Sequence, residues 1–140
     1  MKKKINLILL ILWMIFIFIM SSFNSNDSSS QSGFIVNVLN CIFKIDNVEI
    51  LTFIIRKLAH ITEYFILSIL MINCLKDSKI KNIFIIAILL SILYSCTDEI
   101  HQLFISGRSG SIIDVMIDSI GIILGIYIYK LFRNKIFRIE

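Results

Sequence analysis

Four long runs of apolar residues, separated by short polar segments, organise this chain. The runs cover about residues 5–23, 52–75, 82–104 and 111–132, and no proline interrupts them. Each run is close to the roughly 20 residues that a helix needs to cross the hydrocarbon core of a bilayer. Since only helices and closed barrels span membranes, the pattern predicts an all-α fold, in which residues 1–140 form one integral membrane domain of four transmembrane helices.

The first run has a second interpretation, because a secretory signal peptide also combines a basic start with an apolar stretch. Lys2, Lys3 and Lys4 precede this run, and Ser21 and Ser22 close it. No A-x-A-like cleavage site follows, and the apolar stretch is long for a signal peptide. We therefore expect an uncleaved first helix, with a cleaved signal peptide as the alternative.

The segment between the first two runs changes character near its middle. Residues 24–32 are polar and low in complexity, which predicts an external linker. Residues 34–45 are apolar except for Asn37, Asn40 and Lys44, whose spacing puts them on one face of a helix. Twelve residues are too few to span a bilayer, so this segment predicts a short helix that lies in the membrane interface.

Composition and charge agree with a membrane location. Apolar residues make up 57% of the chain and charged residues 17%, against about 25% charged in soluble domains. The formal charge of +4 does not indicate nucleic acid as a partner, because the basic residues lie in small groups between apolar runs. Ten of the 14 Lys and Arg residues lie within residues 2–4, 76–81 and 130–138. The positive-inside rule therefore predicts a multi-pass protein of the cell membrane with both termini in the cytoplasm.

Polar side chains interrupt the last three runs on one helical face each. Arg56, His60 and Glu63 follow i, i+4, i+7 spacing in the second run, Asp98 and His101 continue a stripe in the third, and Asp114 and Asp118 start one in the fourth. In the predicted topology all three stripes lie near the outer face of the membrane. The predicted cluster comprises Arg56, Lys57, His60, Glu63, Asp98, Glu99, His101, Arg108, Asp114 and Asp118.

Charges at membrane depth usually have a function, because each costs about 2.5–3.5 kcal/mol at the helix centre. The alternative is a structural network of ion pairs that holds the helices together. The Gly121-x-x-x-Gly125 pattern in the fourth run predicts close packing against another helix.

The motifs of the last three runs resemble those of the VanZ-like family of small membrane proteins. They are Arg56-Lys57-x-x-His60-x-x-Glu63-Tyr64, then Thr97-Asp98-Glu99-x-His101-Gln102-x-Phe104, Gly107-Arg108, Asp114, Asp118 and the two glycines of the fourth run. The resemblance implies a protein of the cell envelope with a link to resistance to teicoplanin, a lipidated glycopeptide that acts on cell-wall precursors outside the membrane.

Three functions compete at this stage. The first is binding of an anionic, lipid-anchored ligand, such as a lipid-linked cell-wall precursor or the glycopeptide antibiotic; its ligand-binding candidates are Arg56, Lys57, Gln102, Arg108, Asp114 and Asp118. The second is an acid–base or metal-dependent enzyme acting on polyprenyl-phosphate-type lipids, with His60, Glu63, Asp98, Glu99 and His101 as catalytic candidates. Their spacing matches no zinc signature, so neither a metal nor another cofactor is predicted. A transporter ranks third, because the inner halves of the runs carry almost no charge.

Overall fold

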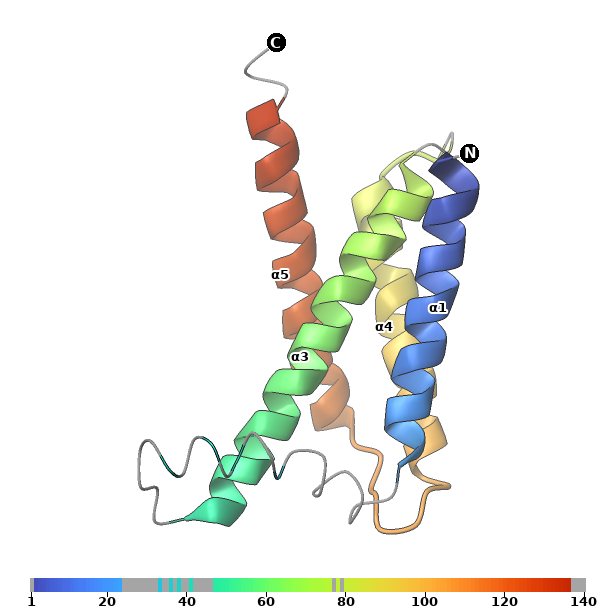
Figure 1. Ribbon diagram of the computed structural model, residues 1–140. Helices are drawn as coiled ribbons and strands as arrows, with labels where there is room; N and C mark the ends of the chain where they lie inside the picture. The colour runs from blue at the N-terminus through green and yellow to red at the C-terminus, as the bar shows by residue number, and fades with distance from the viewer. Residues whose placement is uncertain are drawn as a thin grey trace.

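Among the residues that it describes, a computed structural model shows four helices, α1 (Lys2–Ser22), α3 (Val48–Leu75), α4 (Ile83–Gln102) and α5 (Ile112–Ile136). Each is antiparallel to the next along the chain, so that the start of α1 and the end of α5 lie at the same end of the bundle (Figure 1). The structure describes residues 2–23, 47–76, 78 and 80–136, together with the single positions 33, 36, 38 and 41. The predicted linker of residues 24–32 and, apart from three isolated positions, the predicted interfacial helix of residues 34–45 lie outside the described residues.

The four helices overlap the four apolar runs of the sequence. They are 21, 28, 20 and 25 residues long, and each contains a stretch apolar enough to cross a bilayer. Large apolar side chains on their outer faces are exposed, including Leu12, Leu89 and Leu93 at 57%, 60% and 61%. A water-soluble monomer rarely exposes so continuous an apolar surface, whereas lipid covers it. The prediction of an all-α fold with four membrane-spanning helices is confirmed.

Helices α3 and α4 each contact the other three helices, and the most extensive packing joins α3 to α5. Two glycines permit this approach. A Cβ on Gly121 would lie 2.2 Å from the backbone oxygen of Ile61, and one on Gly125 would lie 2.2 Å from Oγ of Ser68. The Gly121-x-x-x-Gly125 pattern therefore brings the backbones of α5 and α3 together, as its spacing predicted.

Helix α1 is an integral part of this bundle. Leu10 and Ile17 lie in the apolar core at 6% and 1% exposure. The indole of Trp13 donates a hydrogen bond to the backbone oxygen of Glu63 (3.0 Å), and the hydroxyl of Tyr94 donates one to the backbone oxygen of Met14 (2.6 Å). These bonds connect α1 to both α3 and α4, and they satisfy polar groups that lipid would leave unpaired.

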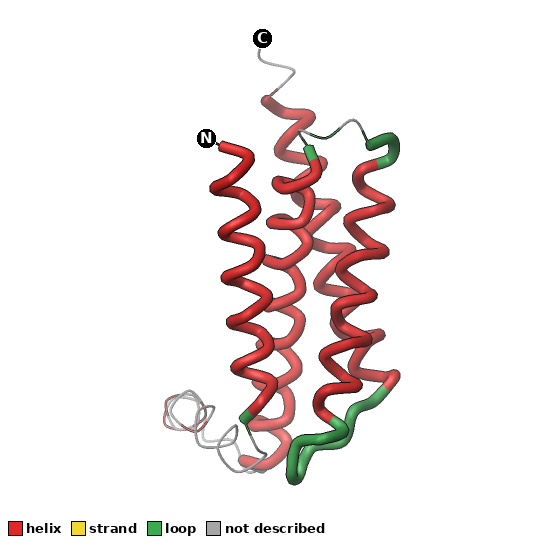
Figure 2. Tube along the Cα trace, turned by 90° about the vertical axis from the view of Figure 1, so that its right-hand side faces the viewer, coloured by secondary structure: helices red, strands yellow, loops and turns green. Residues whose placement is uncertain are grey.

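The connection between α4 and α5, residues 103–111, lies at the end of the bundle opposite the chain termini (Figure 2). We call this end of the molecule the charged end, because ionisable side chains of α3, α4 and α5 meet there, namely Lys57, His60, Asp98, Glu99, Asp114 and Asp118. Helix α3 starts near it with an N-cap in which the side chain of Asn47 accepts a hydrogen bond from the backbone nitrogen of Ile50 (3.2 Å). Helix α5 starts there directly after Ser111, whose hydroxyl oxygen accepts a hydrogen bond from the backbone nitrogen of Ile113 (3.1 Å).

Candidate functional site

A pocket of about 200 Å³ opens at the charged end between α3, α5 and the α4–α5 connection. Four basic side chains border it, with one carboxylate among them. Its lining residues are Phe53, Arg56, Lys57, His60, Gln102, Gly107, Arg108, Ser109 and Asp114. Five of the six predicted ligand-binding residues therefore line one pocket; the sixth, Asp118, is fully buried below it.

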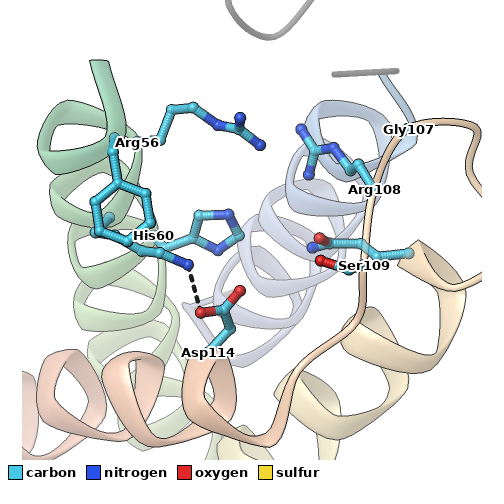
Figure 3. A pocket seen from close by; sticks show the side chains of 9 residues that line it. Arg56, His60, Gly107, Arg108, Ser109 and Asp114 are labelled. Carbon is cyan, nitrogen blue, oxygen red and sulfur yellow. Dashed lines mark hydrogen bonds and ion pairs between the residues drawn. The ribbon is translucent and has the colours of Figure 1, made fainter. Parts of the chain in front are cut away.

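Two arginines define the rim of the pocket. Figure 3 shows the side chains of Arg56 and Arg108 extending toward each other above the ring of His60. Burial lowers the pKa of the Arg108 guanidinium, and the nearby positive charge of Arg56 lowers it further. Two guanidinium groups held this close repel each other, so an anion between them would be stabilised by both.

The third strong base, Lys57, is already neutralised. Its ammonium group forms an ion pair and hydrogen bond with Asp114 at the first turn of α5 (Figure 3). The same ammonium group lies 5.2 Å from the centroid of the Phe53 ring, in cation–π geometry. The positive charge of Lys57 is therefore less available to a ligand than that of an unpaired lysine.

Below the pocket, Asp118 of α5 meets α3 and α4. Its side chain is fully buried, and its Oδ2 accepts a hydrogen bond of 2.6 Å from the hydroxyl of Ser95. Its other oxygen, Oδ1, lies 3.5 Å from Nδ1 of His60. Neither Oδ1 nor Nδ1 has a hydrogen-bond partner within the described parts of the chain.

Two further acids of α4 are buried at the same level. Glu99 is 5% exposed, and its Oε2 accepts a hydrogen bond from the backbone nitrogen of Ser111 (2.8 Å). Asp98 is 3% exposed, and its Oδ2 accepts one from the side-chain amide of Gln102 (3.1 Å). In each carboxylate the second oxygen has no hydrogen-bond partner among the residues that the structure describes. Buried carboxylate oxygens in this state are uncommon and point to a ligand, an ion or a water.

A family model described as VanZ/LLP1 matches residues 6–133 of the chain. The chain belongs to the VanZ/LLP1 family. The match begins in α1 and ends in α5, so it covers all four helices and extends beyond the motifs that suggested the family. No curated protein and no solved structure matches the chain. With four helices apolar enough to cross a bilayer, this VanZ/LLP1 protein is a multi-pass membrane protein.

Two of the predicted catalytic candidates of the VanZ/LLP1 protein, His101 and Glu63, neither line the pocket nor join the group of His60, Glu99 and Asp118 below it. The ring of His101 stacks on Phe18 of α1 at a centroid distance of 4.3 Å, and its Nε2 lies 3.0 Å from the hydroxyl of Ser22. It therefore faces α1 and not the pocket. Glu63 is half-buried on α3, three residues after His60, and does not line the pocket.

Sequence reasoning missed two residues that position the buried acids, Ser95 and Ser111. Ser95 holds Asp118 through its hydroxyl, and Ser111 holds Glu99 through its backbone nitrogen. A signal for Ser95 was present, because Ser91, Ser95 and Glu99 follow i, i+4, i+8 spacing and form a second polar stripe on α4. The contact of Ser111 depends on how the α4–α5 connection folds back, which no periodicity encodes.

Proposed function

We propose that this VanZ/LLP1 protein binds the anionic headgroup of a lipid-linked ligand at the charged end, which faces the outside of the cell, and thereby contributes to resistance to glycopeptides of the teicoplanin type. The observation that carries the proposal is the pair of guanidinium groups, Arg56 and Arg108, at the rim of one pocket. Arginine suits this role, since its planar fork contacts phosphate and carboxylate groups at two points.

The size of the pocket supports a headgroup over a whole ligand. Its volume of about 200 Å³ is below the roughly 300–1,000 Å³ of sites for drug-sized molecules. Exposed aromatic and aliphatic side chains border the same end of the bundle, namely Phe53, Leu103 and Phe104 at 60%, 60% and 81% exposure. A phosphate or carboxylate would occupy the pocket while the attached apolar chain lies along these side chains in the lipid.

The distribution of basic residues supports an outward-facing pocket. Among the described residues, most Lys and Arg lie at the opposite end of the bundle, namely Lys2, Lys3, Lys4, Lys76, Lys81, Lys130 and Arg133. The positive-inside rule assigns that end to the cytoplasm. Lipid-linked cell-wall precursors and glycopeptides are then accessible to the charged end.

Susceptibility of a Gram-positive host tests the role in resistance. We expect expression of the wild-type protein to raise resistance to teicoplanin more than resistance to vancomycin, which lacks the lipid chain. Arg56→Gln and Arg108→Gln should abolish the gain at unchanged membrane levels, whereas Arg133→Gln, an exposed residue at the opposite end of α5, should keep it. Equal resistance in all variants would exclude the pocket from this role.

A membrane-embedded enzyme acting on polyprenyl-phosphate-type lipids is the second candidate. It is favoured by the buried oxygens of Asp98 and Glu99 that have no hydrogen-bond partner within the described residues. Such groups, next to a pocket for an anion, suit acid–base chemistry. Incubation of the purified protein with a polyprenyl pyrophosphate and measurement of released phosphate tests this candidate; turnover that Asp98→Asn and Glu99→Gln abolish would favour it over simple binding.

A further inference from the structure

We infer that the charged end holds a divalent metal ion, bound by His60, Glu99 and Asp118 below the pocket. The three residues come from three different helices, α3, α4 and α5. One potential ligand atom of each lies within 4.8 Å of the other two. Residues so far apart in the sequence meet here because the glycines of α5 let its backbone approach α3 closely.

The potential ligand atoms are buried and have no hydrogen-bond partner among the residues that the structure describes. Asp118 is fully buried and Glu99 is 5% exposed. In both carboxylates one oxygen is held by a hydrogen bond, from the Ser95 hydroxyl to Asp118 and from the Ser111 backbone nitrogen to Glu99. The other oxygen of each, and Nδ1 of His60, has no hydrogen-bond partner within the described chain. Metal-binding carboxylates show this pattern, in which an outer hydrogen bond orients the group and leaves one oxygen for the ion.

An ion pair between His60 and Asp118 does not account for the whole arrangement. A protonated His60 would satisfy Oδ1 of Asp118 across their 3.5 Å separation, but it would leave Oε1 of Glu99 buried without a partner. A divalent cation satisfies both carboxylates and the imidazole nitrogen together. Since two close carboxylates repel strongly at low dielectric, the cation would also remove that repulsion.

The spacing fits an ion of small radius. Tetrahedral zinc with bonds near 2.1 Å places its ligand atoms about 3.4 Å apart, which the 3.5 Å between His60 and Asp118 approaches. The three ligand atoms lie within 4.8 Å of one another, so tetrahedral spacing requires a shift of at most about 1.4 Å. One imidazole and two carboxylates suit Zn²⁺ or Mn²⁺ better than Ca²⁺, which takes six to eight oxygen ligands.

Metal content of the full-length protein, purified in detergent and equilibrated with Zn²⁺ or Mn²⁺ before removal of excess ion, tests this site. We expect about one ion per chain in the wild type. Asp118→Asn and Glu99→Gln should lose it, because an amide is a far weaker ligand than a carboxylate. Asp114→Asn is the matched control, since it removes an acid of the same helix one turn away, and it should keep the ion.

The thermal unfolding temperature of the wild type gives a second measurement that needs no variant. Binding to the folded state alone raises it, so chelation should lower it and Zn²⁺ or Mn²⁺ should restore it. Absence of a stoichiometric ion with no thermal shift overturns the inference, as does full retention of the ion by Asp118→Asn and Glu99→Gln. Because Arg56→Gln and Arg108→Gln should keep the ion, failure of the anion pocket and failure of the metal site are distinguishable.

Discussion

The hydroxyl of Ser95 on α4 donates a hydrogen bond of 2.6 Å to Oδ2 of Asp118 on α5, and both side chains are completely buried. This bond fixes the orientation of an acid that sits at the junction of three helices. Without it, Asp118 would have neither oxygen hydrogen-bonded within the described structure. The position of Asp118 relative to His60 therefore depends on a residue of a third helix.

We predict that Ser95→Ala destabilises the protein by about 1–3 kcal/mol, because it leaves a buried carboxylate oxygen without its donor. Thermal unfolding in detergent measures the change. Ser119→Ala is the matched control, since within the described residues the hydroxyl of Ser119 donates a hydrogen bond to the backbone oxygen of Val115 in its own helix (2.7 Å) and to no other helix. Equal unfolding temperatures for Ser95→Ala and the wild type would contradict this account of the bond.

Gly121→Ala should separate α5 from α3. The added Cβ would lie 2.2 Å from the backbone oxygen of Ile61, and a backbone atom cannot move aside cheaply. We expect a loss of about 1–3 kcal/mol in stability, the usual cost of overpacking. Gly33→Ala, where no described atom lies within 4 Å of the new Cβ, should leave the unfolding temperature unchanged. Comparable losses in the two variants would show that contact with α3 is not the cause.

Asp114→Asn should strengthen binding of an anion in the pocket. The substitution removes the ion-pair partner of Lys57, so the ammonium group becomes available to the ligand. We expect a gain of a few-fold in affinity, on the order of 1 kcal/mol, for a polyprenyl phosphate in nanodiscs. The gain should shrink at high salt because the pair is partly exposed. A weaker affinity in the variant would indicate that Asp114 contacts the ligand itself.

The orientation of the bundle is testable with single cysteines. In a background lacking Cys41, Cys74 and Cys96, Ser109→Cys at the charged end should react with an impermeant maleimide in intact cells. Ser78→Cys, in the connection at the opposite end, should react only after the cells are opened. The reverse labelling would place the pocket in the cytoplasm and remove extracellular ligands from consideration.

The packing of α1 against α3 and α4 favours its retention in the mature protein. The indole of Trp13 donates a hydrogen bond to Glu63 of α3, and the backbone oxygen of Met14 accepts one from Tyr94 of α4. Ile17 is buried in the core. We predict that the membrane form of the protein begins before residue 5, which N-terminal sequencing of the purified chain determines. A mature chain that starts near residue 24 would instead identify α1 as a cleaved signal.

Helix positions were predictable here because a span is a length of apolar sequence, and the bilayer imposes that length. The shared faces of Arg56 with His60 and of Asp114 with Asp118 were also predictable, since one helix fixes them. The rotation of α4 about its own axis could not be predicted from the sequence. Its polar residues surround more than one face, and its packing against α1, α3 and α5 together decides that His101 lies against Phe18 while Glu99 lies against Ser111 at the start of α5.

The central claim is that Arg56 and Arg108 form one site for the anionic headgroup of a lipid-linked ligand. Binding of a polyprenyl phosphate to the full-length protein in nanodiscs, compared with the uncharged polyprenol, tests it most directly. We predict that the phosphate binds and the alcohol does not, that Arg56→Gln and Arg108→Gln each weaken phosphate binding by about tenfold or more, and that Arg133→Gln leaves it unchanged. Phosphate binding of equal strength in the wild type and in the Arg56→Gln, Arg108→Gln double variant would contradict the claim.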